Sequence, residues 1–411
     1  MIQGAVGHAW GETPLVNLAV VWLHAETGVR SRAGCSTRLF LENNMQKEII
    51  APTIDDLVKP ERILKAMHEC ENGVRWKASV QGFELDTLMW AASIRNDLIN
   101  GTFKTKGFKR FDIVERGKLR HIQAVHISER AVQKLLCEYA LKPVILPKLI
   151  YDNSASLKGK GTAFALKRLR EHLRWHCARY GKTGAVLVMD YTNFFDSMPH
   201  DGVIAALQEG QTDPLIRKYI ADFVNAFDGD YGIGLGSEIS QLAAVLYPTP
   251  VDKFIKEQLR VHCYARYMDD SYIIHPDRRF VEESLSLICK EAQKYGLTIN
   301  RKKTKIHNLA SDDFVFLKKR VHLEDNGKII LRLTRQNIQR EEARLRYVRA
   351  EYDAGRMSAD AARQSYKAWR GYAKSYNAYR AVGNMDRYAK SILGDFFLKG
   401  DEKANAAYCY T

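Results

Sequence analysis

Three aspartates are the residues of this sequence whose types and positions could do chemistry together. Two of them, Asp269 and Asp270, are adjacent within the largely apolar stretch HCYARYMDDSYIIH. The third, Asp190, ends the apolar run AVLVMD far upstream. A carboxylate among apolar neighbours is costly unless it is paired or binds a cation. The pattern therefore predicts either a polar hairpin turn with solvated aspartates or a site for divalent metal ions.

A pair of metal ions is the arrangement that we favour for these carboxylates. Mg²⁺ prefers oxygen ligands and is usually held by one or two carboxylates together with substrate phosphates. Two such ions about 3.5–4 Å apart stabilise both the attacking and the leaving oxygen in phosphoryl transfer. We therefore expect nucleotide polymerisation with two Mg²⁺ ions as the cofactor, and Mn²⁺ stays open as a replacement.

The apolar patterns around the aspartates indicate the elements that must position them. AVLVMD has the pattern of a short buried strand, and HCYARYMDDSYIIH that of a hairpin with the aspartate pair at its tip. A helix is expected from Ser128, as N-cap, to the residue before Pro143. Asn326 and Gly327 predict the turn of a later hairpin. Strands and helices alternate in the manner of an α+β fold.

The composition favours a nucleic-acid partner. The 411 residues include 63 Lys and Arg against 48 Asp and Glu, a net charge of +15. Such an excess favours a polyanion, with nucleic acid ahead of an anionic membrane surface. No apolar run reaches the roughly 18 residues that span a bilayer. The seven cysteines lack metal-ligand spacing, so we expect reduced thiols in a cytoplasmic protein without a membrane partner.

Seven blocks of the sequence, taken in order, resemble the motifs of reverse transcriptases of the prokaryotic kind. The resemblance extends from about Phe108 to Leu393. YMDD resembles motif C, and the run that begins VMDYTNFF resembles motif A. The blocks are RGKLRHI with SERAVQ, IYDNSASLKGKGTAFA, VMDYTNFFDSMPHD, GLGSEISQLAAVLY, YMDD, GLTINRKKTKI and FVFLKKR.

The resemblance implies an α+β right-hand polymerase with fingers, a ferredoxin-like palm and a helical thumb. It implies an N-terminal extension over 1–44, N-terminal helices and fingers over 45–184, and a palm with the primer-grip hairpin over 185–333. The helical thumb and a C-terminal tail would occupy 334–411. Because residues 1–44 carry few acidic side chains and no sustained period, we expect this extension to be dispensable.

The resemblance also implies roles for the residues around the aspartates. Asp190 and Asp269 would hold the metals, with Asp270 assisting and Tyr191 contributing to the same metal site. Lys303 matches a proton donor to the pyrophosphate leaving group, although its neighbours Lys302 and Lys305 compete for that role.

Further residues match the family's nucleotide and primer contacts. Phe195 matches the bulky residue that clashes with a 2′-hydroxyl, with a core aromatic as the alternative reading, and Lys118 and Arg120 match the grip on the triphosphate. The implied nucleotide-binding residues are Lys118, Arg120, Tyr191, Asn193, Phe194, Phe195, Leu235, Gly236 and Gln241. The implied primer grip consists of Phe316, Leu317 and Lys318.

One turn departs from the family pattern. Many members carry Pro-Gln-Gly before the motif B helix, whereas this chain has Gly234, Leu235 and Gly236. Together with Ser240 and Gln241, this turn is more similar to the enzymes of diversity-generating retroelements and other bacterial lineages.

The expected function is that of an RNA-directed DNA polymerase that adds dNTPs to a primer 3′-OH. Its partners would be an RNA template, in particular a cognate non-coding RNA, and the DNA product; an accessory protein stays open. Two alternatives remain: template-independent or protein-primed synthesis from a protein hydroxyl, as in anti-phage defence, and a catalytically inactive nucleic-acid-binding scaffold. A diversity-generating element, a retron, a phage-defence system and a prophage-borne enzyme all stay open as settings.

Overall fold

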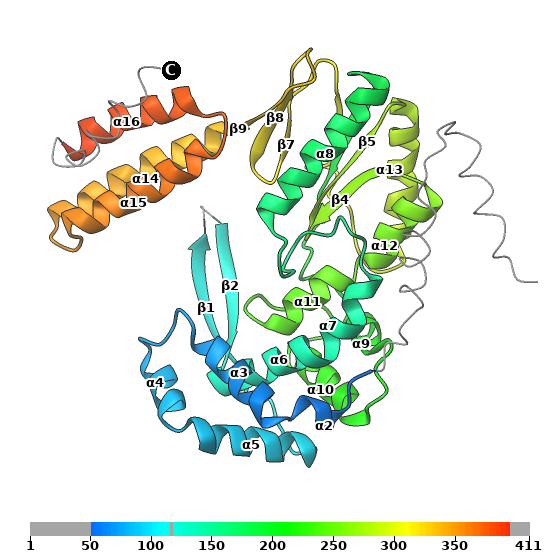
Figure 1. The fold of residues 1–411 in the computed structure, drawn as a ribbon, viewed down its shortest axis with the longest axis vertical. Coiled ribbons are helices and arrows are strands. Elements are labelled where there is room, and N and C mark those ends of the chain that lie inside the picture. Colours follow the sequence, from blue (N-terminus) through cyan, green and yellow to red (C-terminus); the bar gives the residue numbers. More distant parts are fainter. Residues whose placement is uncertain (1–50, 116–117, 395–411) are drawn as a thin grey trace, which may run out of the picture. The chain divides into compact units, whose positions relative to one another are not determined.

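The computed structural model describes residues 51–115 and 118–394, and a four-stranded antiparallel sheet lies at the centre of the elements that carry the aspartates (Figure 1). The strand order is β4-β5-β3-β6. Helices connect β3 to β4 and β5 to β6, so this is the ferredoxin-like order that was predicted. The strands are β3 (Ala185–Met189), β4 (Cys263–Tyr267), β5 (Asp270–His275) and β6 (Lys305–Asn308).

Both faces of this sheet are covered by helices. Alternate residues of each strand point to opposite faces and so belong to different cores. On β3, Val186 packs with helix α8 (Thr162–Tyr180). Its neighbour Leu187 belongs to the larger core that contains helix α13 (Arg278–Gln293). Burial on two faces explains why AVLVMD is a continuous apolar run rather than an alternating one.

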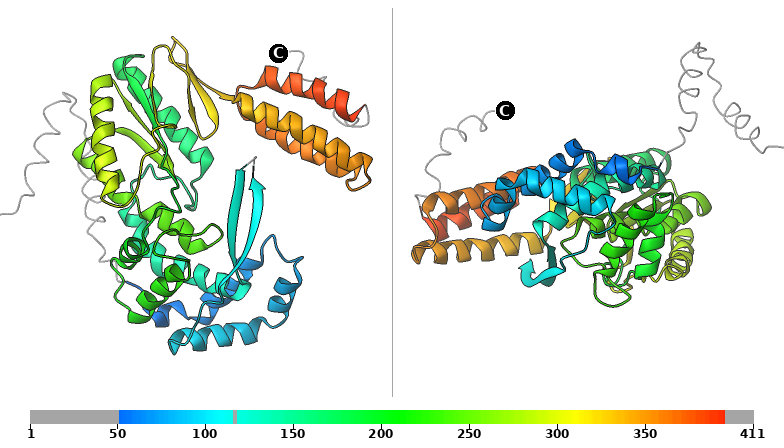
Figure 2. Two further views of the ribbon diagram at one scale, coloured as in Figure 1. Left: turned by 180° about the vertical axis from the view of Figure 1, so that it is seen from behind. Right: turned by 90° about the horizontal axis from the view of Figure 1, so that it is seen from below.

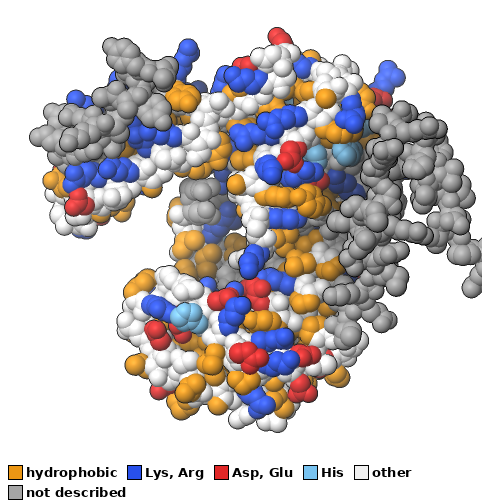
Figure 3. All heavy atoms as spheres, in the orientation of Figure 1, with side chains coloured by type: hydrophobic (Ala, Val, Ile, Leu, Met, Phe, Trp, Pro, Cys, Tyr) orange, Lys and Arg blue, Asp and Glu red, His pale blue; other side chains and the backbone are white. Residues whose placement is uncertain are grey.

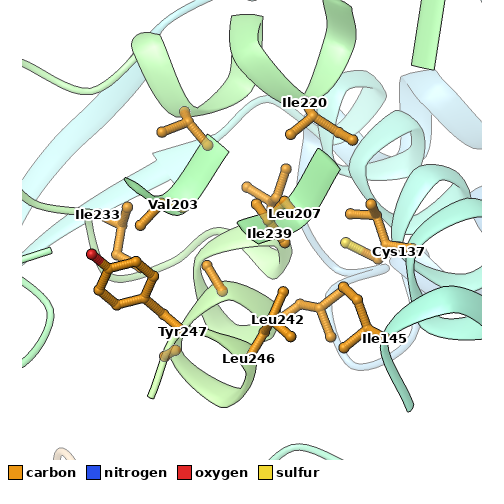
Figure 4. Packing of buried hydrophobic residues seen from close by; sticks show 14 of the residues in the cluster. Cys137, Ile145, Val203, Leu207, Ile220, Ile233, Ile239, Leu242, Leu246 and Tyr247 are labelled. Atoms are coloured by element: carbon orange, nitrogen blue, oxygen red, sulfur yellow. The ribbon is translucent and has the colours of Figure 1, made fainter. Parts of the chain in front are cut away.

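Helices precede the sheet in the sequence and form the connections between its strands. Several of them share one apolar core, in which Figure 4 shows Leu207, Leu242 and Ile145 lying together. The helices are α2 (Ile54–Leu57), α3 (Pro60–Glu71), α4 (Ala78–Leu85), α5 (Thr87–Ile99), α6 (Ile127–Leu136), η2 (Cys137–Leu141), α7 (Lys142–Ile145), η3 (Leu146–Lys148), α9 (His200–Gln208), α10 (Pro214–Asn225), α11 (Glu238–Leu246), α12 (Thr249–Lys253) and η4 (Phe254–Gln258).

The helix predicted from Ser128 to the residue before Pro143 was wrong at both ends. Helix α6 begins one residue earlier, and the side chain of His126 caps it by accepting a hydrogen bond from the Ser128 N–H. The helical path then continues as the π-helix η2 and, through Pro143, as the short helix α7. Pro143 directly follows the π-turn, so its missing N–H coincides with a local change in the helical hydrogen-bond register.

A long hairpin stands between α5 and α6. Its strands, β1 (Phe108–Glu115) and β2 (Lys118–Val125), pair along their whole length. At its base Phe108 stacks on Phe227 with the ring centroids 4.6 Å apart, and Arg110 forms a 2.7 Å ion pair with Asp228. The base of the hairpin is therefore attached to the segment that follows α10.

A three-stranded sheet and a helical bundle complete the described chain. Gly327 has φ +78° in the turn between the last two strands, as the Asn-Gly pair predicted. Lys319 is buried with its Nζ 3.9 Å from the ring centroids of both Tyr372 and Tyr376, which joins this sheet to the bundle. In Figure 2 the three bundle helices stay together in both views. The elements are β7 (Phe314–Phe316), β8 (Lys319–Leu323), β9 (Ile329–Leu333), α14 (Arg335–Asp353), α15 (Ala359–Lys374) and α16 (Tyr379–Leu393).

Two general expectations can be compared with this fold. Among the described residues, no helix combines the length and apolar character needed to cross a membrane. The five cysteines in the described part of the chain are all free thiols. The extension predicted over residues 1–44 lies outside the described residues.

Candidate active site

The aspartate pair lies at a two-residue turn at the end of the central hairpin. Tyr267 of β4 pairs with Asp270 of β5, which leaves Met268 and Asp269 as the turn. Met268 has φ +54°, the left-handed conformation that the first position of such a turn requires. Asp269 therefore lies at the tip of the hairpin, and Asp270 begins β5.

Asp190 directly follows β3, the strand next to β5. Because Met189 pairs with Ser271, one further step along both strands brings Asp190 beside Asp270. The Asp190 carbonyl accepts a 2.8 Å hydrogen bond from the N–H of Asn300, which fixes the chain at this point. The register of the sheet thus brings together three aspartates that are far apart in the sequence.

Burial and repulsion by neighbouring negative charge make the carboxyl groups of Asp269 and Asp270 hard to ionise. Burial, followed by the charge of Asp190, raises the pKa of Asp269 above its ordinary value. Burial, followed by the charges of Asp269 and Asp190, raises the pKa of Asp270 to about 7. The positive charges of Lys303 and Lys318 oppose this increase in the pKa of Asp270 without cancelling it. The cluster therefore carries an excess of negative charge that a bound cation would relieve.

Lys303 is the cation that contacts this cluster most closely. Its Nζ donates to both carboxylate oxygens of Asp190 at 2.8 Å each. The side-chain oxygen of Asn300 accepts from the Lys303 N–H, which helps to orient this residue. Burial alone would lower the pKa of Lys303, but the hydrogen bond to Asp190 and the charges of the three aspartates raise it. Lys303 is therefore a charged ammonium group at neutral pH.

The chemistry of the donors fits a hard divalent cation. Carboxylate oxygens are the ligands that Mg²⁺ prefers, and the raised pKa values of Asp269 and Asp270 reflect uncompensated charge. In the present arrangement of the described residues, no three His, Cys, Asp or Glu side chains converge as the ligands of one metal ion. Because the Lys303 ammonium takes both oxygens of Asp190, binding of a metal ion there requires that this ammonium be displaced.

A buried arginine holds the hairpin that carries Asp269 in place, and the sequence analysis missed it. Arg266 on β4 is fully buried and donates to both oxygens of Asp252, at 2.8 Å from Nε and 2.7 Å from Nη2. The same guanidinium donates to the carbonyl of Val245 at 2.8 Å and to that of Met268 at 3.2 Å. Tyr264 donates to Asp252 as well, at 2.6 Å. Arg266 thus connects the end of α11 to the turn that carries Asp269.

The signal for this arginine was present in the sequence. Arg266 interrupts the apolar strand CYARY, and a charge in a buried strand must be paired. The same reasoning that selected Asp269 and Asp270 would have selected Arg266 and required a carboxylate partner. Only the fold identifies Asp252 as that partner.

The glycine turn before α11 lies directly against strand β2. The N–H of Gln123 donates to the carbonyl of Leu235 at 2.9 Å. A Cβ on Gly236, whose φ is +117°, would lie 2.9 Å from the Gln123 carbonyl oxygen. A Cβ on Gly234 would lie 1.9 Å from the side-chain oxygen of Gln123. Gly236 is therefore explained by its positive φ and the close approach of the two backbones, whereas Gly234 makes room for the side chain of Gln123.

Four of the five residues after Asp190 differ in how far their side chains are exposed. Tyr191 and Phe194 are buried and stack with their ring centroids 5.3 Å apart. Burial above all raises the pKa of the Tyr191 phenol well above its ordinary value. Contacts of these two residues with a metal or a nucleotide would therefore involve their backbone. Asn193 is exposed with φ +44°, and Phe195 is only partly buried, so the two readings of Phe195 both remain.

The predicted triphosphate contacts lie on β2. Lys118 is the first residue of that strand and Arg120 lies two residues further on. Although burial is the larger influence on the pKa of Asp269, the charge of Arg120 acts to lower it. Gln241, which is exposed on α11, accepts a 3.4 Å hydrogen bond from Ser156 in the loop before α8. The charge of Arg120 therefore acts on the aspartates, whereas Gln241 contacts the loop before α8.

The predicted primer grip lies at the turn between β7 and β8. Phe316 pairs with Lys319, which leaves Leu317 and Lys318 as the turn, with φ values of +47° and +61°. Two positive φ values favour Asn and Gly, so this turn is strained by about 1 kcal/mol at each residue. Burial chiefly sets the pKa of Asp270, but the charge of Lys318 lowers it. The strained turn therefore lies within the electrostatic reach of the aspartates.

Comparison with protein families decides to which family this arrangement belongs. A family model described as reverse transcriptase (RNA-dependent DNA polymerase) matches residues 104–345, more than half of the chain. This chain belongs to the reverse transcriptase family. The match confirms that the ordered sequence blocks are those of a reverse transcriptase, whereas the prokaryotic kind stays a prediction. Comparison with curated protein sequences found no match.

Two solved telomerase structures are among the chains that are similar to this reverse transcriptase. One is telomerase from Candida albicans in complex with a fragment of telomeric RNA, with 10% identity and a TM-score of 0.43 over 72% of this chain and 59% of that chain. The other is apo telomerase from Candida tropicalis, truncated from its C-terminal domain, with 16% identity and a TM-score of 0.41 over 54% of each chain. This chain spans less than two thirds of either telomerase chain.

In the terms of the reverse transcriptase family, the four-stranded sheet is the palm. The prediction of an α+β right-hand polymerase with a ferredoxin-like palm is therefore confirmed. The palm is the element that carries Asp190, Asp269 and Asp270.

Proposed function

We propose that this chain is an RNA-directed DNA polymerase that adds deoxynucleotides to a primer 3′-OH on an RNA template. The observation that carries the proposal is the cluster of Asp190, Asp269 and Asp270 on the palm of a reverse transcriptase, with more negative charge than its cationic neighbours neutralise. A cluster of this kind is suited to binding cations beside the phosphates of a nucleotide.

Two Mg²⁺ ions, or Mn²⁺ in their place, are the cofactor that we propose. Asp190 and Asp269 would hold them, with Asp270 and the backbone of Tyr191 assisting. When bound, such ions stabilise the charge that develops on the attacking and leaving oxygens of phosphoryl transfer.

The side chains around the aspartates have separate tasks in this proposal. Arg120, together with Lys118, binds the triphosphate through charge-assisted hydrogen bonds. Phe195 lies beneath the sugar and disfavours a 2′-hydroxyl, while the turn at Leu317 and Lys318 orients the primer end. Lys303, once it has left Asp190, donates its proton to the departing pyrophosphate oxygen.

The finer assignments also belong to this proposal. We keep fingers over 45–184, palm over 185–333 and thumb over 334–411 as the division of the chain. The turn at Gly234–Gly236 supports a prokaryotic enzyme of the diversity-generating, retron or phage-defence kind, working in the cytoplasm with a cognate RNA. Sequencing of RNA that copurifies with the full chain tests this setting.

The activity is tested by Mg²⁺-dependent incorporation of dNTPs on a DNA-primed RNA template. Asp269→Asn removes one charge with little change in shape, and we expect a loss of about a thousandfold or more in kcat. The matched control is Asp222→Asn on α10, a partly exposed carboxylate that pairs with Lys218, whose rate should equal that of the wild type.

Three other outcomes would favour the alternatives. Equal incorporation by wild type and Asp269→Asn would contradict the assignment of the aspartates. No incorporation by the wild type on any primed template, with RNA still bound, would identify an inactive scaffold. DNA that stays attached to the protein after denaturation, formed without a primer, would identify protein-primed synthesis.

A further inference from the structure

A second polar cavity of the palm lies away from the aspartates. It has a volume of about 280 Å³ and opens beside the start of β4. His262, at the far end of the cavity, lies six residues before Met268 along an extended strand and so roughly 20 Å from the turn that carries Asp269. The near end is closer, because the carbonyl of Asp152 accepts a 3.2 Å hydrogen bond from the N–H of Arg266. The residues that line the cavity are Asp152, Arg168, His172, Lys256, Arg260, Val261 and His262.

Positive charge dominates this cavity. Arg168 donates to Asp152 at 2.5 Å, and Lys256 donates to the other oxygen of the same carboxylate at 3.3 Å. Arg168 also pairs with Glu171, which does not line the cavity. Within the described chain, Arg260 forms no ion pair with a carboxylate. Three cations therefore share a single lining carboxylate.

The backbone that presents these cations is irregular. Lys256 lies in the π-helix η4, and its Nζ donates to the carbonyl of His262 at 2.7 Å. Arg260 follows with φ +53°, a conformation that strains a residue other than glycine by about 1 kcal/mol. Single π-turns and strained residues of this kind are frequent at functional sites. Both irregularities lie in the short segment that places Lys256 and Arg260 at the cavity.

A stripe on helix α8 continues from the cavity, with His172 buried at its inner part and Arg179 exposed at its outer end. Arg168, His172, Trp175 and Arg179 recur every three or four residues and so lie on one face of the helix. Trp175 stacks on His262 with the ring centroids 4.1 Å apart, and the guanidinium of Arg179 lies 4.1 Å from the Trp175 ring. Figure 3 shows Lys, Arg and His side chains together on the face of the molecule that carries α8.

We propose that this cavity binds a backbone phosphate of RNA that lies outside the primer–template duplex, with the α8 stripe guiding the adjoining nucleotides. The inference rests on the proposed function, because it assumes that the enzyme works with a structured or extended RNA. Arginine binds phosphate through its planar fork and lysine through a point charge. An open cavity continued by basic and aromatic side chains suits a polynucleotide better than a small free anion.

The experiment compares two RNA templates annealed to the same DNA primer. One carries single-stranded flanks of about 30 nucleotides at both ends and the other has none, and dissociation constants are measured by fluorescence anisotropy at several salt concentrations. Wild type should bind the flanked template more tightly. In Arg260→Glu that advantage should fall by about tenfold, and the salt slope on the flanked template should decrease by about 0.7.

The control is Arg279→Glu, an exposed arginine on α13 that undergoes the same change in charge. An equal loss in both variants would show that net charge alone causes the effect and would overturn the proposal.

Melting temperatures measured with added inorganic phosphate test whether the cavity binds a free anion rather than RNA. Stabilisation of wild type but not of Arg260→Glu, with no change in the flank advantage, would assign the cavity to a free anion instead. An unaltered flank advantage without phosphate stabilisation would leave only a structural ion-pair network.

The binding readout does not depend on catalysis. If the wild type incorporates no dNTPs but Arg260→Glu still loses the flank advantage, the proposed polymerase activity fails while the RNA contact stands. If incorporation is normal and the flank advantage is the same in wild type and Arg260→Glu, the polymerase activity stands and the proposed RNA contact fails.

Discussion

Two sets of carboxylates in the same palm have opposite electrostatic surroundings. Asp252 is fully buried and accepts hydrogen bonds from Arg266 and Tyr264. Asp269 and Asp270 have raised pKa values, because burial and their neighbours' negative charge outweigh the nearby cations. Asp252 has a structural role because the fold itself satisfies it. The aspartates at the hairpin tip depend on a charge that the fold does not supply, which indicates a ligand.

The largest test of this contrast removes the partner of Asp252. Arg266→Met leaves a carboxylate buried and unpaired, so we expect the free energy of unfolding to fall by about 3–5 kcal/mol. The double variant Arg266→Met/Asp252→Leu removes both charges and should recover most of that loss, because an apolar pair can replace a buried ion pair. Denaturant unfolding of the three proteins measures both effects.

The same double variant separates positioning from stability. It folds without the donor that holds the Met268 carbonyl, so kcat for dNTP incorporation should fall by about tenfold while KM changes little. A double variant that is both stable and fully active would show that Arg266 supports the fold alone.

A smaller effect of opposite sign is expected at the hairpin tip. Asp270→Asn removes a charge that is repelled by its neighbours, so in EDTA at pH 8 the variant should be more stable than wild type by about 1–2 kcal/mol. Asp252→Asn, the matched substitution at the satisfied carboxylate, should instead be less stable than wild type. Destabilisation by both substitutions would remove the distinction between the two sets.

The pH dependence of stability refines the comparison. The pKa of Asp270 is about 7 in the folded protein against 3.8 for an ordinary aspartate. Between these values the folded state holds a proton that the unfolded chain has lost, so stability falls as pH rises. Asp152 should behave oppositely. Burial raises its pKa, but hydrogen bonds from His172 and Arg168 lower it further, so its contribution is lost only as pH falls below about 4.

The measurement is the difference in unfolding free energy between Asp270→Asn and wild type in EDTA, followed with pH. It should grow from near zero at about pH 4 to its full size of about 1–2 kcal/mol above pH 7. A difference that stays constant over this range would show that Asp270 does not titrate there. Saturating Mg²⁺ should reduce the difference, since a bound cation compensates the carboxylate.

The palm could be predicted because its signals are local. An apolar run that ends in Asp190 and a hairpin with two aspartates at its tip each follow from neighbouring residues. The path past Pro143 was missed, since a π-turn changes the hydrogen-bond register without a periodicity of its own. The partners of Arg266 and of Asp190 could not be read from the sequence, because they depend on segments that only the folded sheet brings together.

The glycine turn illustrates the same limit on a smaller scale. Against the family pattern Pro-Gln-Gly, the sequence shows Leu235 in place of the glutamine. The structure instead explains the flanking glycines by a contact with Gln123, which lies more than a hundred residues earlier. Nothing in the spacing of either segment predicts that contact.

The attachment of β2 to this turn also has a mechanical consequence. The base of hairpin β1–β2 is joined to Leu235 and to Phe227. Bending of the hairpin would therefore take place beyond Gln123. Arg120 lies three residues from Gln123 toward the tip of the hairpin, in the part that would move. The turn at Leu235 would stay with α11. A swing of the outer hairpin would therefore change the distance between this guanidinium and the aspartates without moving the turn at Leu235.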